Sequence, residues 1–542
     1  DKLEFDKELL RRLYLTSGYT DFSVLSANAY QPEGEEDFVI DFELSEGPKY
    51  SFGKISVESS IKNIDLSAIE ESIETIEGEI FNAALIESSI DAITNIVAEK
   101  GYAFVAIDPI INKNSKKQLV NITYNIKQGS KIYIENINIT GNTRTLDKVI
   151  RREFRLHETD PYNASKIRRS RQRIQNLGFF EKVDLKTNPG SAKDKANIDL
   201  NVVERSTGEL NFGAGFSTTD GALANTSIRE RNFLGKGQDL ELSLQTATQG
   251  IEIDLSFTEP YFMDKDLALG FDIFKITRDR ESESSFDSDT VGSTVNLTYS
   301  IFEELRHTIR YSFRADDITN IEEDASRFIQ DQAGENTTSL FGHSLFYDKR
   351  DRVSLPTSGY SLRFIQDFAG IGGDSEFIRN ELRGNYFTPL FDNKEIVLKL
   401  SAQTGYIWGM TGEDIRINER FFIGGNDIRG FETAGIGPRD IDTLDSLGGN
   451  LYYTASSEVR YPLGLPKELG VLGATFIDVG SLTSVDDNGE EVVDESSLRL
   501  SVGVGISWNS PIGPIRLDYA EPVVKEDFDK TQKFKFTFGA RF

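Results

Sequence analysis

The residue types that carry most enzyme chemistry are sparse in this chain of 542 residues. The three histidines, His157, His307 and His343, lack the spacing of a metal site. No serine has the strand-to-helix setting of a nucleophile elbow. Cysteine is absent, which excludes disulfide and thiolate chemistry. The sequence therefore predicts a protein that is not an enzyme, with no catalytic residue, no metal site and no cofactor.

Two other segments carry residues that often take part in chemistry, but their settings favour loops. The run Gly370-Ile371-Gly372-Gly373 lacks the strand-to-helix setting that a phosphate-binding loop needs. The acidic pair Asp316-Asp317 is interpreted as solvated loop charges. Neither segment changes the expectation of a non-enzyme.

Residues 409–448 form a long, glycine-rich segment that we predict to connect two strands. Loops of this length are usually either functional or disordered. A lone arginine, Arg429, lies between apolar neighbours in this segment, which favours a folded structure, although an ordinary surface loop has the same texture. Two shorter motifs, at residues 231–237 and 348–359, have the composition of turns between strands.

The elements that must position these motifs are predicted from alternating apolar and polar residues. Between Lys533 and Phe542 every second residue is apolar, so this strand would have one apolar face and one polar face. Similar segments follow one another from residue 207 onwards. We predict sixteen strands, at residues 207–217, 222–233, 238–248, 250–258, 266–278, 287–301, 305–319, 337–348, 358–368, 378–388, 394–408, 449–462, 469–481, 496–508, 513–520 and 533–542.

A closed barrel in a membrane explains this pattern better than an open sheet. A bare apolar edge strand invites aggregation, and closure removes the edge. Charged residues on the alternate face, such as Arg516 and Asp518, suit a wet lumen. The chain has no run of roughly 18 apolar residues, which excludes a helical membrane protein, and its net charge of -28 argues against nucleic acid. A soluble β-sandwich or a propeller is the alternative.

The first 206 residues have a different texture, with an internal repeat of about 80 residues. Three glycine–aromatic pairs, spaced 83 and 77 residues apart, each end a predicted helix and open a strand: Gly18-Tyr19, Gly101-Tyr102 and Gly178-Phe179. Asn82 and Asn163 could cap the preceding helices, and Gly47-Pro48 and Gly129-Ser130 mark the joins. Each unit has β-α-α-β-β content. The first copy lacks its opening strand and first helix, so we expect further repeats upstream.

Together these segments resemble the outer-membrane assembly-factor superfamily over the whole chain. The repeats resemble POTRA domains, and Gly141-Asn142-Thr143-Arg144-Thr145 is typical of the repeat next to the barrel. Residues 348–359 resemble the turn motif of that superfamily, and residues 428–431 are similar to its Val-Arg-Gly-Phe signature, with Ile in place of Val.

The resemblance implies α+β POTRA repeats (β-α-α-β-β) followed by an all-β, 16-stranded antiparallel transmembrane barrel. We expect a partial POTRA at residues 1–48, a complete POTRA at 49–130, a POTRA adjoining the barrel at 131–206, and the barrel at 207–542 with residues 409–448 folded inward.

The resemblance also implies site residues. The loop signature consists of Ile428, Arg429, Gly430 and Phe431. Its arginine is implied to contact acids on nearby strands, which here are Glu458 and Asp478, and an ordinary lumen ion-pair network is compatible with the same residues. The first and last strands are implied to form a weak seam. Glycine weakens strand packing, although a small-residue lumen face is the alternative. The expected seam residues are Leu210, Phe212, Gly213, Gly215, Phe216, Phe534, Phe536, Phe538 and Phe542.

The implied function is the insertion of β-barrel proteins into the outer membrane of a Gram-negative bacterium, by templating of client strands at the seam. The implied partners are unfolded outer-membrane β-barrel clients, accessory lipoproteins of the assembly complex and outer-membrane lipid, with the POTRA repeats in the periplasm. The alternatives within the superfamily are a TamA-like translocation and assembly module, with three POTRA domains, and a two-partner secretion transporter, with two. A passive porin is the alternative from a different class.

Overall fold

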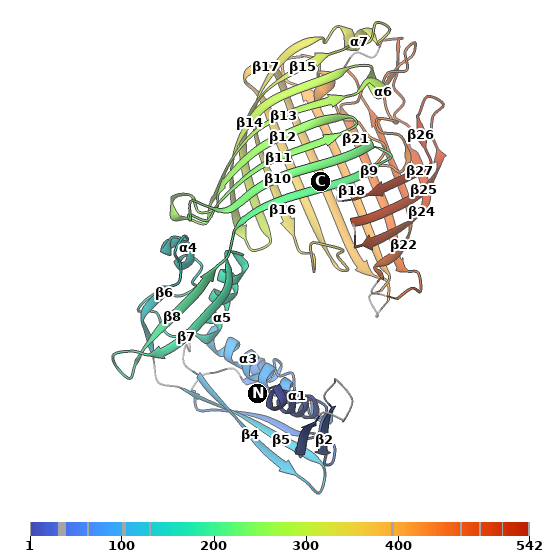
Figure 1. Ribbon diagram of the computed structural model, residues 1–542. Helices are drawn as coiled ribbons and strands as arrows, with labels where there is room; N and C mark the ends of the chain where they lie inside the picture. Colours follow the sequence, from blue (N-terminus) through green and yellow to red (C-terminus); the bar gives the residue numbers. More distant parts are fainter. Residues whose placement is uncertain are drawn as a thin grey trace. The chain divides into compact units, whose positions relative to one another are not determined.

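The computed structural model describes residues 2–30, 39–61, 64, 66–99, 105–128, 132–219, 221–391, 395–466, 469–486, 489–511 and 513–539. Two compact units make up the chain, Asp1–Arg205 and Ser206–Phe542 (Figure 1). Three of the sequence expectations, at Gly101-Tyr102, Gly129-Ser130 and Phe542, lie outside the described residues.

The first unit contains two complete β-α-α-β-β repeats, as predicted. Their elements are β3 (Ser51–Ser59), α2 (Leu66–Glu70), α3 (Ala83–Glu99), β4 (Val105–Asn114) and β5 (Leu119–Gln128), then β6 (Tyr133–Thr140), α4 (Asp147–Arg151), α5 (Ala164–Asn176), β7 (Phe180–Pro189) and β8 (Lys195–Glu204). In each repeat the third strand lies in the middle of the sheet, in the orders β3-β5-β4 and β6-β8-β7. The preceding segment contains α1 (Lys2–Thr16), β1 (Ser23–Tyr30) and β2 (Val39–Ser45).

Helix patterning and caps explain why these segments fold as they do. In α3, Ile93 and Val97 are four residues apart and both are fully buried in the core of their repeat. In α5, Ile174 is fully buried in the core of the next repeat. The side chain of Asn163 accepts a hydrogen bond of 2.9 Å from the backbone N–H of Lys166, so it caps α5 as predicted.

The second unit is a closed antiparallel barrel, drawn from green to red in Figure 1. Each strand pairs with its neighbours along the chain, apart from short strands in the loops, and β9 pairs with β27 to close the barrel. The barrel strands are β9 (Gly208–Ser217), β10 (Gly221–Phe233), β11 (Gln238–Ala247), β12 (Gly250–Glu259), β13 (Ala268–Asp279), β14 (Asp287–Phe302), β15 (Leu305–Thr319), β16 (Gly334–Asp348), β17 (Gly359–Pro389), β18 (Val397–Gly409), β21 (Leu451–Pro462), β22 (Val471–Thr483), β24 (Arg499–Ser510), β25 (Gly513–Val524) and β27 (Phe534–Phe538).

The long strand β17 supplies two passes of the wall, which makes sixteen in total. Its 31 residues would extend about 100 Å as one strand, far beyond a bilayer core of about 30 Å. Its first part pairs with β16 and its second part with β18. Gln366 Nε2 donates to Asn380 Oδ1 at 2.8 Å between the two parts. The chain reverses near Gly372 and Gly373, both at φ +85°, so the predicted pair of strands at 358–368 and 378–388 is confirmed.

Alternation of burial along the strands shows which side chains face outward and which face the lumen. On β24, Val502, Val504, Ile506 and Trp508 are between 38% and 54% exposed, whereas Ser501 is fully buried. The apolar side chains therefore face outward and the polar ones inward, as a lipid-facing barrel requires. Among the helices of the described residues, none has the length and hydropathy needed to cross a bilayer.

One expectation about the barrel residues is wrong. Asp316 is not a solvated loop residue, because it lies in β15, is 5% exposed and forms an ion pair with Arg314 at 3.1 Å. An inward-facing strand position explains this burial, since a paired acid in the lumen is shielded from both lipid and bulk water.

Candidate functional site

The loop between β18 and β21 is folded, and much of it is buried. It contains a short 3-10 helix, η2 (Ile417–Glu419), and two short strands, β19 (Gly430–Phe431) and β20 (Arg439–Asp440). Four of its apolar side chains are at most 3% exposed and share a cluster with Tyr452 and Leu482 of the barrel wall: Ile423, Ile428, Phe431 and Ile436. Apolar burial therefore holds this loop against the wall strands.

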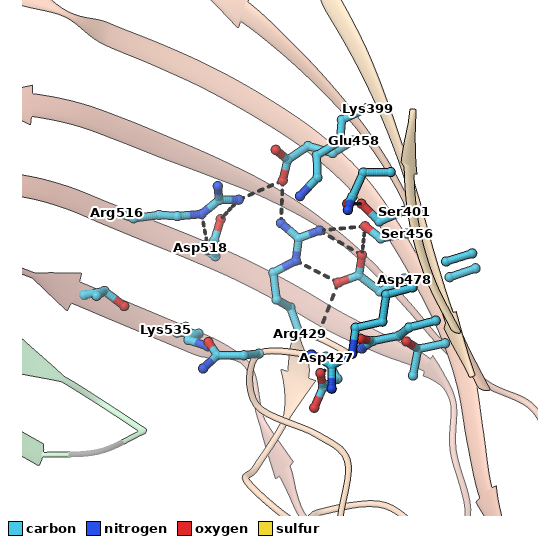
Figure 2. Close-up of a pocket in the computed structure, with 18 of the residues that line it drawn as sticks. Lys399, Ser401, Asp427, Arg429, Ser456, Glu458, Asp478, Arg516, Asp518 and Lys535 are labelled. Atoms are coloured by element: carbon cyan, nitrogen blue, oxygen red, sulfur yellow. Dashed lines mark hydrogen bonds and ion pairs between the residues drawn. The ribbon is translucent and has the colours of Figure 1, made fainter. Parts of the chain in front are cut away.

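Arg429 extends from the loop to two acids on the wall, as Figure 2 shows. Its Nε and Nη2 donate to the two carboxylate oxygens of Asp478 on β22, at 2.7 and 2.8 Å. Its Nη1 donates to Glu458 on β21 at 2.7 Å, and Nη2 also donates to Ser456 at 3.2 Å. The backbone N–H of Arg429 adds a bond of 3.1 Å to Asp478. Bidentate pairing of this kind fixes both the position and the orientation of a guanidinium group.

A second arginine completes the ion-pair network. Arg516 on β25 donates to Glu458 at 2.8 Å and to Asp518 at 2.7 Å. Glu458, Asp478 and Asp518 are at most 5% exposed. Buried carboxylates are stable only when they are paired and hydrogen-bonded, so the two arginines and three acids form one interdependent cluster. Alternation had placed Arg516 and Asp518 on the lumen face, where both lie (Figure 2).

The aromatic partner of Arg429 was not predicted from the sequence. The guanidinium carbon of Arg429 lies 3.3 Å from the centroid of the Phe476 ring, within cation–π range. Phe476 is 1% exposed and shares the inward face of β22 with Ala474 and Asp478. Its shared parity with Asp478 was the available signal, because residues two apart on a strand face the same side.

The signature residues that follow Arg429 connect the loop to the segment before the last strand. Gly430 and Phe431 pair with Gln532 and Thr531 of β26 (Thr531–Gln532). Gly430 has φ +97°, a left-handed conformation that favours glycine. A Cβ at this position would lie 3.3 Å from the Ser501 Cβ. The loop signature therefore contacts both the wall and the chain that enters β27.

The pairing that closes the barrel is short. Within the described residues, β27 pairs with β9 through Thr537↔Ser217 and Phe538↔Phe216, whereas β9 pairs with β10 through ten residue pairs. Two hydrogen bonds extend the contact: the N–H of Thr218 donates to the Phe536 carbonyl at 3.0 Å, and the Phe536 N–H donates to the Thr218 hydroxyl at 3.3 Å.

The expected seam residues occupy different positions in this arrangement. Phe216 and Phe538 pair directly, and the rings of Phe536 and Phe216 lie 6.3 Å apart at a tilt of 38°. Gly215 also borders β27, since a Cβ at this position would lie 2.5 Å from the Phe538 carbonyl oxygen. The printed partners of Leu210, Phe212 and Gly213 are on β10, and Phe534 pairs with Tyr519 of β25. The remaining expected seam residue, Phe542, lies outside the described residues.

A polar cavity of about 490 Å³ lies between the ion-pair network and the last strand. Arg429, Glu458 and Asp478 line it on one side and Lys535 of β27 on another (Figure 2). Thr537 of β27 also lines it. Lys535 also donates a hydrogen bond to Asn426 of the loop. No group of three His, Asp or Glu side chains within the described ranges is arranged to hold a metal ion.

Comparisons with known proteins agree with this architecture. The family model of the Omp85 superfamily domain matches residues 232–542. The POTRA model, described as a surface antigen variable number repeat, matches residues 50–129 and 132–205. A solved structure of BamA from Haemophilus ducreyi lacking POTRA domains 1-3 has a TM-score of 0.74 and 23% identity, covering 91% of this chain and 100% of that chain. It therefore shows the same fold.

Curated relatives match along the whole chain. The outer membrane protein assembly factor BamA of Neorickettsia risticii is 37% identical over 542 residues, which cover 100% of this chain and 72% of the relative. The BamA of Nitratidesulfovibrio vulgaris is 29% identical over 551 residues, covering 100% of this chain and 68% of the relative. The chain thus belongs to the Omp85 superfamily and, within it, to the BamA family of outer membrane protein assembly factors.

Proposed function

We propose that this protein folds and inserts β-barrel proteins into the outer membrane of a Gram-negative bacterium, by templating client strands at the seam between β9 and β27. The observation that supports this proposal is the contrast, among the residues that the structure describes, between the two pairs that close the barrel and the ten that join β9 to β10. Unpaired backbone groups are costly in lipid. A client strand that pairs with the edge of β9 satisfies those groups, so the edge favours strand addition.

The loop signature has a positioning role in this proposal. Arg429 attaches the loop to β21 and β22, and the next two residues pair with the segment that leads into β27. The position of the last strand is thereby tied to the wall strands. We propose that this connection holds the β27 side of the seam in place while a client strand adds to β9.

The first unit supplies the periplasmic part of the proposal. We assign residues 1–48 to a partial POTRA, 49–130 to a complete POTRA and 131–206 to the POTRA adjoining the barrel. Each described sheet has outer strands, such as β4 and β7, that pair on one side. Such edges can bind an extended client by strand addition. Accessory lipoproteins of the assembly complex and outer-membrane lipid are the other proposed partners.

Reconstitution of the full chain tests the proposal. We expect vesicles that contain the protein to convert two unrelated, urea-denatured β-barrel clients to a protease-resistant, heat-modifiable form faster than vesicles that contain an unrelated porin. Vesicle leakage of a small solute is measured in parallel. Solute flux without any acceleration of client insertion would support a passive porin and refute the proposed function.

A further inference from the structure

The loop carries a buried acid whose contacts mirror those of Arg429. Glu419, the last residue of η2, is 1% exposed. Its carboxylate forms an ion pair with Arg379 at 2.9 Å and a second ion pair with Arg314. The hydroxyl of Thr338 lies 3.3 Å from the same carboxylate, and Arg379 also donates to the Glu419 carbonyl. These contacts leave no part of the carboxylate facing solvent.

The partners of Glu419 come from wall strands that Arg429 does not touch. Arg314 lies on β15, Thr338 on β16 and Arg379 on the second pass of β17. The polarity is reversed relative to the first anchor: here the loop supplies the acid and the wall supplies the arginines. Between the two anchors, Gln403 on β18 donates to the Asp427 carboxylate at 2.9 Å. Residues 419–429 are therefore hydrogen-bonded to wall strands from β15 to β22.

The two anchors hold different ends of the segment. Arg429 and the Asp427–Gln403 bond fix its end, and Glu419 fixes its beginning. A second attachment ten residues earlier fixes the direction in which the chain arrives at Gly430 and Phe431. Those two residues must be aligned to pair with Gln532 and Thr531, since backbone hydrogen bonds depend strongly on angle.

We propose that Glu419 is a second positioning residue of the loop, which anchors residues 419–429 to β15–β17 and thereby sets the alignment of the loop signature with the segment entering β27. Its consequence for client insertion rests on the proposed function. The anchor itself does not, because it is a property of the folded chain alone.

The test compares Glu419→Gln with Glu413→Gln in the full chain, reconstituted in lipid vesicles. Both residues are glutamates of the same loop, but Glu413 is exposed. Heat-modifiability on gels first selects folded protein. Chymotrypsin then cleaves after aromatic residues such as Phe421 and Phe431, which are protected when the loop is anchored. We expect Glu419→Gln to be cleaved at least about tenfold faster than wild type, because removal of one partner of a buried ion pair is strongly destabilising, and Glu413→Gln to match wild type.

A cross-link reports the position of the loop directly. The chain has no cysteine, so an Asn426→Cys/Lys535→Cys pair bridged by a short bismaleimide can report contact between the loop and β27, because the Lys535 side chain reaches Asn426. We expect Glu419→Gln to lower the yield of this cross-link. A wall pair, Thr294→Cys/Ser312→Cys, serves as the control and keeps its yield.

Charge reversal keeps the inference testable if Glu419→Gln fails to fold. Glu419→Arg alone should expose the loop, and adding Arg379→Glu should restore protection. Equal cleavage of Glu419→Gln and Glu413→Gln, or no rescue by Arg379→Glu, would overturn the inference. Cleavage and cross-linking need no client, so failure of the proposed assembly function would leave both results unchanged, whereas absence of the anchor would abolish them.

Discussion

Arg429 and Phe476 are stacked inside the barrel, with the guanidinium carbon 3.3 Å from the centre of the ring. Asp478 follows two residues later on the same face of β22 and accepts two hydrogen bonds from the same guanidinium group. One strand therefore presents both an aromatic surface and a carboxylate to a single arginine. The charge of the Asp478 carboxylate and the quadrupole of the Phe476 ring both attract the Arg429 guanidinium group, which belongs to the loop.

Replacement of Arg429 by lysine should weaken the attachment of the loop although the charge is kept. An ammonium group cannot make the bidentate bonds to Asp478 and reach Glu458 at the same time. We expect the free energy of unfolding to fall by about 3–5 kcal/mol, as for a broken buried pair. Urea unfolding in vesicles, followed by tryptophan fluorescence, measures this loss. Arg278→Lys, at an exposed position, is the control, and equal midpoints for the two variants would contradict the prediction.

The contribution of the ring can be separated from that of the carboxylate. We expect Phe476→Leu to destabilise the barrel by about 1–3 kcal/mol through lost packing and lost cation–π attraction. In a double-mutant cycle with Arg429→Lys, the two changes should be coupled by at least about 0.5 kcal/mol. Ile477→Leu, at a neighbouring position that is 48% exposed, should have little effect. Strict additivity in the cycle would show that the stacking contributes nothing.

A disulfide across the seam should block client insertion. Ser217 and Thr537 are direct partners in the antiparallel pairing of β9 with β27, and the Cα separation of such pairs suits a disulfide. We expect the Ser217→Cys/Thr537→Cys variant to lose insertion of clients when oxidised and to regain it on reduction. Client insertion into vesicles under both conditions measures the effect.

The control for the seam disulfide lies elsewhere on the same lumen wall. Thr294 and Ser312 are also cross-strand partners, with hydroxyls 2.9 Å apart, but they join β14 to β15. Oxidised Thr294→Cys/Ser312→Cys should insert clients at the wild-type rate. Full activity of the oxidised seam variant would refute templating at this seam.

In the repeat adjoining the barrel, the carboxylate of Glu204 makes the stability of the 141–145 turn depend on pH. Partial burial opposes ionisation, but hydrogen bonds from Thr145, Thr143 and Arg144 outweigh it and lower the pKa of Glu204 to about 2. Because the pKa is lower in the folded state than its usual value of about 4.3, the stabilisation is present above pH 4.3 and is lost as the pH falls towards 2.

Removal of this carboxylate should loosen the 141–145 turn at neutral pH. We expect Glu204→Gln to cost about 1–2 kcal/mol at pH 7, since charge-assisted bonds are replaced by weaker ones at a partly exposed site. Hydrogen exchange of the peptide that contains the turn measures the change, corrected for intrinsic exchange at each pH. The difference from wild type should shrink between pH 5 and pH 3. Glu181→Gln, at an exposed position on β7, should behave as wild type at every pH.

Local sequence patterns were sufficient to predict the strands of the barrel wall and the main elements of the repeats. The alternation of side chains along a strand is a local property, so all sixteen passes of the barrel could be predicted, including the two that β17 contributes. The repeats were predictable for the same reason, because caps such as Asn163 and the 3.6-residue period act within one helix. Asp316 was misplaced because two adjacent acids carry no periodic signal of their own.

The contacts between lumen side chains could not be predicted from local sequence patterns, because they join residues that are far apart in the sequence. Glu419 meets Arg314 across 105 residues of sequence, and Arg429 meets Asp478 across 49. Alternation assigns a residue to a face, but it does not say which lumen residue lies opposite which. The resemblance supplied Glu458 and Asp478 as partners of Arg429, whereas Phe476 and Glu419 emerged only from the structure. Tertiary structure alone sets these pairings, because the curvature and register of the closed barrel determine which side chains from distant strands lie within hydrogen-bonding distance.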